Sequence, residues 1–247
     1  MKAVLLGGTK GMGRALARLL VAKGHDLFLI GRDEADLARS ARDIEVRGGR
    51  PAQSVKVAAC DLASPATFGP ALDAADRALG SFDTVVITAG LFATQDKLEA
   101  DPAFTALMLN ANFTGTVLLC EEARKRLLAR GGGTLCVFSS VAGERGRKPV
   151  ILYGASKAGL TRYLEGLDHK FRERGLAVVT VKPGFVKTSM TAGLPAPPFA
   201  GTPDGVAKLV LRGIERRSPV VYAPRIWAVI MAVIRLLPRA VMRKIGF

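Results

Sequence analysis

Short apolar runs alternate with longer amphipathic segments along the chain. Most of the runs are rich in Val, Leu and Ile and lack alternating polar residues, which is typical of parallel strands buried on both faces of a sheet. We expect strands at Lys2–Gly7, Leu27–Ile30, Ser54–Ala59, Thr84–Thr88, Thr134–Phe138, Ala177–Lys182 and Val220–Tyr222.

The segments between these strands have the spacing of amphipathic helices, and the clearest are Gly13–Lys23, Glu34–Arg47, Ala103–Arg130 and Val150–Arg174. Strands that alternate with helices form right-handed βαβ units in a doubly wound sheet. The 247 residues, of which 49% are hydrophobic, are enough for one large core. We therefore predict an α/β Rossmann fold, with a single domain over residues 1–247 and about seven parallel strands flanked by helices. The Pro-rich stretch Leu194–Pro203 is expected to be a loop or lid.

Charge and composition exclude several classes of protein. The formal net charge is +15, but no element typical of a duplex-reading protein is present, so we expect no nucleic acid partner. No run reaches about 18 apolar residues, so no membrane-spanning helix is expected, and the N-terminus is interpreted as a strand and not as a signal peptide. The three cysteines form no Cys-x-x-Cys motif and the two histidines have no companion ligands. We therefore expect no metal site and a reducing, cytoplasmic compartment.

A glycine-rich turn follows the first strand, with the sequence Gly7-Gly8-Thr9-Lys10-Gly11-Met12-Gly13. Glycines here allow a tight turn and the close approach of a pyrophosphate, which then lies at the N-terminus of the next helix. Because the turn has the strand–turn–helix context that dinucleotide binding requires, we predict a nucleotide site.

The end of the second strand, Ile30-Gly31-Arg32-Asp33, indicates which dinucleotide binds. A fold that prefers NAD places an acid there for the ribose hydroxyls, whereas Gly31 offers no carboxylate. Arg32, helped by Lys10, suits the 2′-phosphate of NADP, so NADP(H) is the expected cofactor. Asp33 is interpreted as the N-cap of the next helix.

Tyr153 and Lys157 lie four positions apart in a predicted helix, and Ser140 lies thirteen positions upstream of Tyr153. Positions i and i+4 share one helix face. A phenol has a reference pKa near ~10, and a close ammonium lowers that pKa. The three residues therefore suit general acid/base chemistry, with Ser140 holding the oxygen that Tyr153 protonates.

Together these features resemble the short-chain dehydrogenase/reductase family over essentially the whole chain. The departures are small, because Leu6 and Thr88 stand where many members have Thr and Asn. The matching motifs occur in the family's order: the glycine turn, Asp61-Leu62, Thr88-Ala89-Gly90, Asn112-Phe113-Thr114-Gly115, Ser139-Ser140, Tyr153 with Lys157, and Pro183-Gly184-Phe185-Val186-Lys187-Thr188.

The resemblance implies hydride transfer between NADPH and a carbonyl or alcohol carbon. It implies that Tyr153 protonates the oxygen, that Lys157 lowers the tyrosine pKa and binds the nicotinamide ribose, and that Ser140 donates a hydrogen bond to the carbonyl oxygen. Asn112 is implied to hold a water that links Lys157 to solvent. The implied catalytic residues are Asn112, Ser140, Tyr153 and Lys157, and the implied cofactor-binding residues are Gly7, Thr9, Lys10, Gly11, Met12, Gly13, Arg32, Asp61, Leu62, Ala89, Gly90, Tyr153, Lys157, Pro183, Gly184, Val186 and Thr188.

The second half also resembles the branch that contains decaprenylphosphoryl-ribose 2′-keto-reductases, through residues 140–147, residues 153–160 and the C-terminal tail. This implies an amphipathic or lipid-linked substrate, for example a keto-sugar on a polyprenyl phosphate. Two alternatives are open: a soluble 3-oxoacyl-type or small-ketone reductase, and a regulator that binds NADP without turnover. The full catalytic set argues against the regulator, because binding alone does not require all four residues.

The C-terminal tail is apolar and basic. Residues 208–247 hold nine Lys and Arg against one acid, Glu215, and Ile226–Ile234 is wholly apolar with Trp227 near its start. Such a segment suits a helix in the interface of an anionic membrane. A helix packed on the core or on a second subunit is an equal alternative, and a Trp227 buried in the free protein would favour it.

These alternatives set the expected partners and location. We expect a helical tail over residues 225–247, a homo-oligomer (dimer or tetramer) and a cytoplasmic protein that, if the tail binds membrane, lies at the inner face of the cell membrane. If the tail only packs, the positive charge would instead serve to capture an anionic substrate through Arg145, Arg147 and Lys148.

Overall fold

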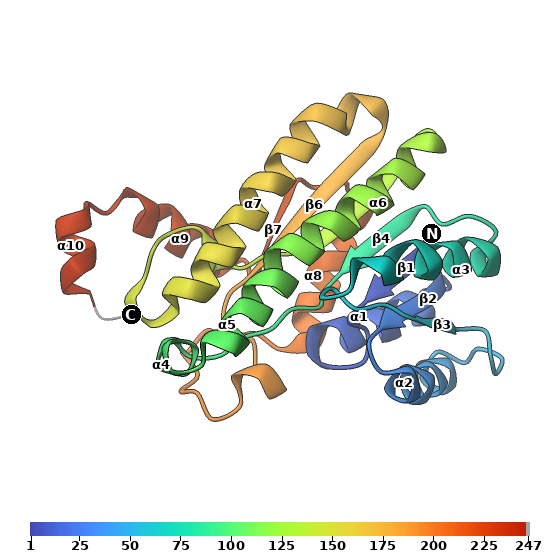
Figure 1. Ribbon diagram of the computed structural model, residues 1–247, viewed down its shortest axis with the longest axis horizontal. Coiled ribbons are helices and arrows are strands. Elements are labelled where there is room, and N and C mark those ends of the chain that lie inside the picture. The colour runs from blue at the N-terminus through green and yellow to red at the C-terminus, as the bar shows by residue number, and fades with distance from the viewer. Residues whose placement is uncertain (246–247) are drawn as a thin grey trace.

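The computed structural model describes residues 1–245 and shows one parallel sheet between two layers of helices (Figure 1). Its seven strands lie in the order β3-β2-β1-β4-β5-β6-β7, and every pair of neighbours is parallel. The predicted fold class is confirmed. The strands are β1 Lys2–Leu6, β2 Asp26–Gly31, β3 Lys56–Ala59, β4 Thr84–Ile87, β5 Gly133–Phe138, β6 Leu176–Pro183 and β7 Val220–Ala223.

Alternate side chains of the central strands enter two separate cores. In β1, Ala3 and Leu5 pack with one helix layer, while Val4 and Leu6 pack with the other. Burial of both faces explains why the strands show no polar alternation. The first layer consists of α1 Gly11–Ala22, α2 Glu34–Arg47 and α8 Pro203–Glu215, and the second of α3 Phe68–Leu79, α6 Thr116–Ala129 and α7 Ile151–Phe171.

The winding direction reverses between β1 and β4, so the carboxyl ends of these two strands flank a crevice. In a doubly wound sheet this crevice is the usual ligand site. The shorter elements lie around it and at the far end of the molecule. They are α4 Gln95–Ala100, α5 Pro102–Leu109, α9 Ile226–Leu236, α10 Arg239–Lys244 and 3₁₀ turns at Pro65–Thr67, Val141–Gly143, Lys148–Val150, Arg172–Arg174 and Ser189–Thr191.

The helix predicted over Ala103–Arg130 is present as a continuous helix over Pro102–Ala129, with a change of helix type in its middle. A π-helical turn at Asn110–Gly115 separates α5 from α6. It lies where the helix passes the backbone of Leu62 so closely that a Cβ atom on Gly115 would be 1.9 Å from the Leu62 carbonyl oxygen. π turns of this kind are frequent at functional sites, and hydrophobic periodicity alone does not predict them.

The stretch Pro102–Ala129 is long and apolar enough to cross a membrane by length and composition, which the sequence analysis did not expect. Its inner face, which includes Leu119, Ala123 and Leu127, is buried in the core with the sheet. Packing against the sheet accounts for the apolar residues of this inner face, whereas Leu107, Phe113 and Leu118 are 39%, 39% and 42% exposed.

The tail forms helices α9 and α10, which lie at one end of the molecule beside the start of α7 (Figure 1). Trp227 of α9 is 8% exposed. Its ring faces Gly184, where a Cβ atom would be 1.9 Å from the indole nitrogen, and it makes an edge contact with Phe199 at 5.3 Å between ring centroids. The burial of Trp227 favours the alternative in which the tail packs on the core, because this face of α9 packs on the body of the protein.

Candidate active site

The glycine turn is built for a close ligand. Gly7 and Gly11 have φ angles of +92° and +50°, which side chains rarely allow. A Cβ atom on Gly13 would lie 2.2 Å from the Gly7 carbonyl oxygen. Helix α1 begins directly after the turn without a side-chain cap, so its N-terminus is suited to an anion.

A cavity of about 340 Å³ lies beside this turn and gathers residues that are far apart in the sequence. Its lining by the glycine turn and by the exposed cations Lys10 and Arg32 fits a dinucleotide. Met12 packs against the core, and Thr188 lies against the turn, where a Cβ atom on Gly11 would be 3.4 Å from it. The predicted residues that line the cavity are Gly7, Thr9, Lys10, Arg32, Asp61, Leu62, Ala89 and Gly90.

Arg32 and Lys10 are exposed at the rim of this cavity. Within residues 1–245 neither side chain has an ion-pair partner. Asp33 caps α2 as interpreted, because its carboxylate accepts a hydrogen bond from the Asp36 amide at 2.9 Å. The Asp33 carboxylate therefore caps α2 and does not pair with Arg32. Arg32 and Lys10 remain accessible to a phosphate.

Thr88 has a clear structural role. Its hydroxyl oxygen lies 3.0 Å from the Leu6 carbonyl oxygen and 3.1 Å from the Gly7 carbonyl oxygen, and these two acceptors share its hydrogen bond. The side chain thus ties the end of β4 to the start of the glycine turn, so the departure from Asn keeps a hydrogen-bonding residue at this junction.

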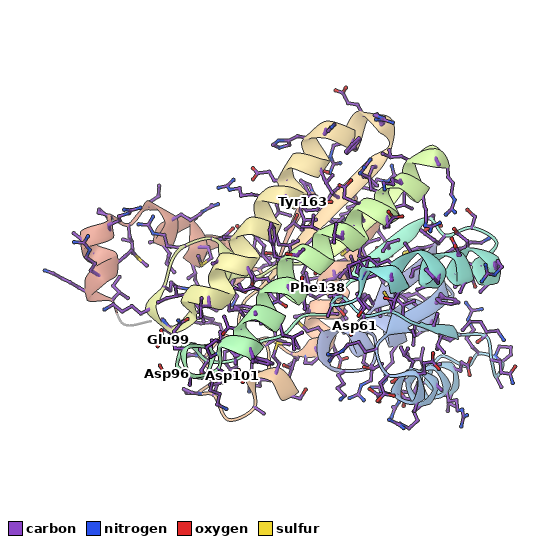
Figure 2. All side chains as sticks on the ribbon, in the orientation of Figure 1. Asp61, Asp96, Glu99, Asp101, Phe138 and Tyr163 are labelled. Carbon is purple, nitrogen blue, oxygen red and sulfur yellow. The ribbon has the colours of Figure 1, made fainter. Side chains whose placement is uncertain are left out.

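Tyr153, Lys157 and Ser140 meet where β5 ends and α7 begins. The Lys157 ammonium is buried, donates to the Phe138 carbonyl at 3.0 Å and lies 5.9 Å from the centroid of the Tyr153 ring. The Ser140 hydroxyl accepts from the Ala142 amide at 3.1 Å and donates to the Pro183 carbonyl at 3.5 Å. Figure 2 labels Phe138, the last residue of β5, and Asp61, which lies two residues after the end of β3.

Burial dominates the proton affinities of this group. It raises the pKa of Tyr153 to about 12, although a hydrogen bond with Ser140 acts in the opposite direction. Burial also lowers the pKa of Lys157 to about 8. The expected lowering of the Tyr153 pKa by Lys157 is therefore not seen in this structure, because burial of the phenol is the largest cause of the shift and Lys157 is not among its causes.

Asn112 acts as a clamp. It is fully buried in the π turn, its carbonyl oxygen accepts from the Leu91 amide at 2.7 Å, and its NH₂ group donates to the Leu91 carbonyl at 2.8 Å. A Cβ atom on Gly90 would lie 3.0 Å from Asn112 Oδ1 and 3.5 Å from Lys157 Nζ. The side chain therefore fixes the segment after β4 beside Lys157, and its water-holding role remains a prediction.

Sequence reasoning missed a buried ionic cluster that adjoins the site. The Glu144 carboxylate, 3% exposed, pairs with Lys182 at 2.6 Å and accepts a hydrogen bond from the Tyr222 hydroxyl at 2.6 Å. Arg235 of α9 lies 3.9 Å away. Glu144 follows Ser140 by four residues and Lys182 precedes Pro183, so the cluster joins the segments on both sides of the Ser140–Pro183 contact. No local sequence motif predicts this cluster, because its members come from four separate elements.

The basic loop after Glu144 holds the tail. Arg145 donates to the Leu237 carbonyl at 2.6 Å and Lys148 donates to the Arg243 carbonyl at 2.7 Å. Leu237 and Arg243 lie at the C-terminal ends of α9 and α10, where cations are favourable. The two cations therefore hold the tail in place, and their capture of an anionic substrate remains a prediction.

Phe92 is a second residue that the sequence did not reveal. Its ring meets Tyr153 edge to face, with 5.0 Å between ring centroids. This contact limits the movement of the phenol and presents an apolar wall beside the hydroxyl.

The geometry agrees with comparisons to known proteins. An oxidoreductase of Mycobacterium tuberculosis, named as uncharacterised, is 32% identical over 243 residues, covering 98% of this chain and 95% of that protein. A Streptomyces coelicolor oxidoreductase, also named as uncharacterised, is 34% identical over 247 residues, covering 98% and 94%. An actinorhodin polyketide ketoreductase variant, solved with NADPH, matches the fold with a TM-score of 0.79 at 22% identity, over 90% of this chain and 95% of that one.

The family profile described as short chain dehydrogenase matches residues 1–197. These residues contain the glycine turn, Asn112, Ser140, Tyr153 and Lys157. The resemblance to the decaprenylphosphoryl-ribose branch remains a prediction. The chain belongs to the short chain dehydrogenase family.

Proposed function

We propose that the protein is an NADPH-dependent carbonyl reductase, which also runs as an alcohol dehydrogenase in the reverse direction. The observation that carries this proposal is the convergence of Tyr153, Ser140 and the buried Lys157 beside the glycine-turn cavity. A protein of this family binds a nicotinamide cofactor, and the glycine cradle with its adjoining cavity fits one. When bound, the nicotinamide supplies or accepts the hydride.

The chain's own residues manage the proton and the orientation. The phenol of Tyr153 stays protonated at neutral pH, because its pKa is raised to about 12, so it donates a proton to the substrate oxygen as negative charge develops there. Ser140 holds the same oxygen through a hydrogen bond. Lys157 carries its positive charge below pH about 8, stabilises the phenolate left behind and orients the ribose.

The preference for NADPH over NADH rests on Arg32 and Lys10, the two exposed cations at the cavity rim. An arginine binds a phosphate through charge-assisted hydrogen bonds, worth about 1.5–3 kcal/mol. We expect Arg32→Ala to reduce the ratio of kcat/KM for NADPH to kcat/KM for NADH by the factor that about 1.5–3 kcal/mol represents. Arg42→Ala, an exposed arginine on the same helix layer, is the matched control. Equal use of both cofactors by the wild type would contradict this part of the proposal.

The substrate is proposed to be amphipathic or lipid-linked, with a keto-sugar on a polyprenyl phosphate as one candidate. Support comes from exposed apolar side chains close to the site: Ile151 begins α7, Met190 follows Thr188, and Phe199 contacts Trp227. A 3-oxoacyl or small-ketone substrate uses the same catalytic residues and is the alternative. A substrate panel with matched short-chain and long-chain ketones separates the two.

The test is NADPH oxidation with this panel. Tyr153→Phe should lower kcat by roughly 100-fold or more while NADPH binding stays within a few-fold. Tyr163→Phe is the control, because Tyr163 lies on the same helix and donates instead to Glu121 at 2.7 Å. Absence of turnover with every carbonyl, in a folded protein that binds NADPH, would indicate a binding protein and overturn the proposal.

A further inference from the structure

Helix α9 has two apolar faces, and only one of them is covered. Trp227, Met231 and Ile234 are buried against the body of the protein. The α9 outer face consists of Ile226, Val229, Val233 and Leu236, on the opposite side of the helix, and the last three are 63%, 57% and 85% exposed. These residues have i, i+3, i+7 and i+10 spacing, so they form one continuous stripe. Such an exposed stripe marks an interaction surface.

Basic residues surround this stripe. Residues 216–247 contain no Asp or Glu, so the tail presents its cations without neutralising acids of its own. The cations that flank the α9 outer face along the chain are Arg225, Arg235, Arg239, Arg243 and Lys244, all of them exposed.

We propose that the α9 outer face docks on an anionic lipid surface, with the stripe in the interface and the flanking cations at the head groups. Apolar burial together with attraction of anionic lipid is the combination that holds interfacial helices. A second copy docked through the same face would bring two cationic tails together, which is unfavourable. The acidic residues Asp96, Glu99 and Asp101, labelled in Figure 2, lie on α4 and at the start of α5 and not on the tail. The consequence is a peripheral location at the anionic inner face of the cell membrane.

The α9 outer face is held at a fixed position relative to the active site. Arg145 and Lys148 hold the ends of α9 and α10, and Trp227 packs on Gly184, directly after Pro183 of the catalytic contact. Docking would therefore hold the site at a set position next to the bilayer. The use of that position for an amphipathic substrate rests on the proposed function, whereas docking itself does not depend on the reaction.

The experiment is flotation of the full-length protein with vesicles. Phosphatidylcholine vesicles that contain phosphatidylglycerol are compared with vesicles of phosphatidylcholine alone. Val229→Ser with Leu236→Ser should weaken partitioning into the anionic vesicles by roughly tenfold. Val46→Ser is the matched control, because Val46 is an 81% exposed apolar residue on α2. Arg239→Gln with Arg243→Gln should weaken binding at low salt and reduce its salt dependence.

Three outcomes decide the proposal. Binding to anionic vesicles that is lost in the outer-face variant and kept in Val46→Ser supports it. Absence of binding to anionic vesicles at low salt overturns it. A wild-type oligomer that Val229→Ser with Leu236→Ser dissociates, seen by sedimentation, also overturns it, because the occupant would then be a second copy. NADPH oxidation measured without vesicles distinguishes failure of docking from failure of the proposed reaction.

Discussion

Two buried lysines, one on α7 and one on β6, lie in different surroundings. Lys157 and Lys182 are 4% and 7% exposed. Lys182 pairs with the Glu144 carboxylate at 2.6 Å, whereas Lys157 donates to a neutral carbonyl, that of Phe138, and burial alone lowers its pKa to about 8. One ammonium is neutralised by the protein and the other is not.

The difference teaches which buried charge serves structure and which serves chemistry. In a buried ion pair, removing one partner leaves the other charge buried without a counter-ion, which is unfavourable. A buried ammonium without a counter-ion can bind and release its proton near neutral pH, which is what a proton relay requires. We therefore expect the Glu144 cluster to control stability and Lys157 to control turnover.

The largest expected effect is on stability. Glu144→Gln leaves Lys182 buried without its carboxylate, so the free energy of unfolding should fall by about 3–5 kcal/mol. Chemical denaturation monitored by circular dichroism measures it. Glu122→Gln is the control, because that glutamate pairs with Lys125 at 3.0 Å on the surface, where little loss is expected. Equal small losses for both variants would remove the distinction between the two lysines.

The phenol in the same cluster should matter less. Tyr222→Phe removes one hydrogen bond to the Glu144 carboxylate but leaves the pairing with Lys182, so the loss of unfolding free energy should be about 1.5–3 kcal/mol. A loss as large as that of Glu144→Gln, in the same denaturation measurement, would mean that Tyr222 and not Lys182 is the main partner.

The smallest effect is a pH dependence. Because Lys157 loses its proton as the pH rises through about 8, kcat/KM for carbonyl reduction should fall above that pH by about tenfold per unit. Tyr153 should not contribute in this range, because its pKa is raised to about 12. The same decline should persist when Glu144 and Lys182 are replaced together. A profile that is flat up to about pH 10 would show that Lys157 stays charged.

The locality of contacts explains what could be predicted from the sequence. The strands occur in the structure with shifts of one or two residues at their ends, and the helix Glu34–Arg47 has the predicted bounds. Both were predictable because strand and helix periodicities depend only on neighbouring residues. The Tyr153–Lys157 spacing is local too, so their shared helix face was predictable. The residues of the Glu144 cluster lie 38 and 78 positions apart, and no periodicity connects them.

In the C-terminal tail, the local sequence pattern was not enough to predict which side chains are buried. A run of apolar residues cannot reveal which of its side chains are buried when almost all of them are apolar, so the sequence left open whether Trp227 faces the core or a membrane. The contact that decides it, with Gly184, is long-range. The raised pKa of Tyr153 has the same origin, since desolvation depends on the packed surroundings and not on the helix spacing.

The most direct test of this account is the turnover of two variants at a temperature where both are folded. Lys157→Met should lower kcat with NADPH by roughly 100-fold or more. The double variant Glu144→Gln/Lys182→Met, which removes both charges of the buried pair, should keep kcat within a few-fold. Loss of turnover in the double variant, with near-normal turnover in Lys157→Met, would contradict the division between a structural and a catalytic lysine.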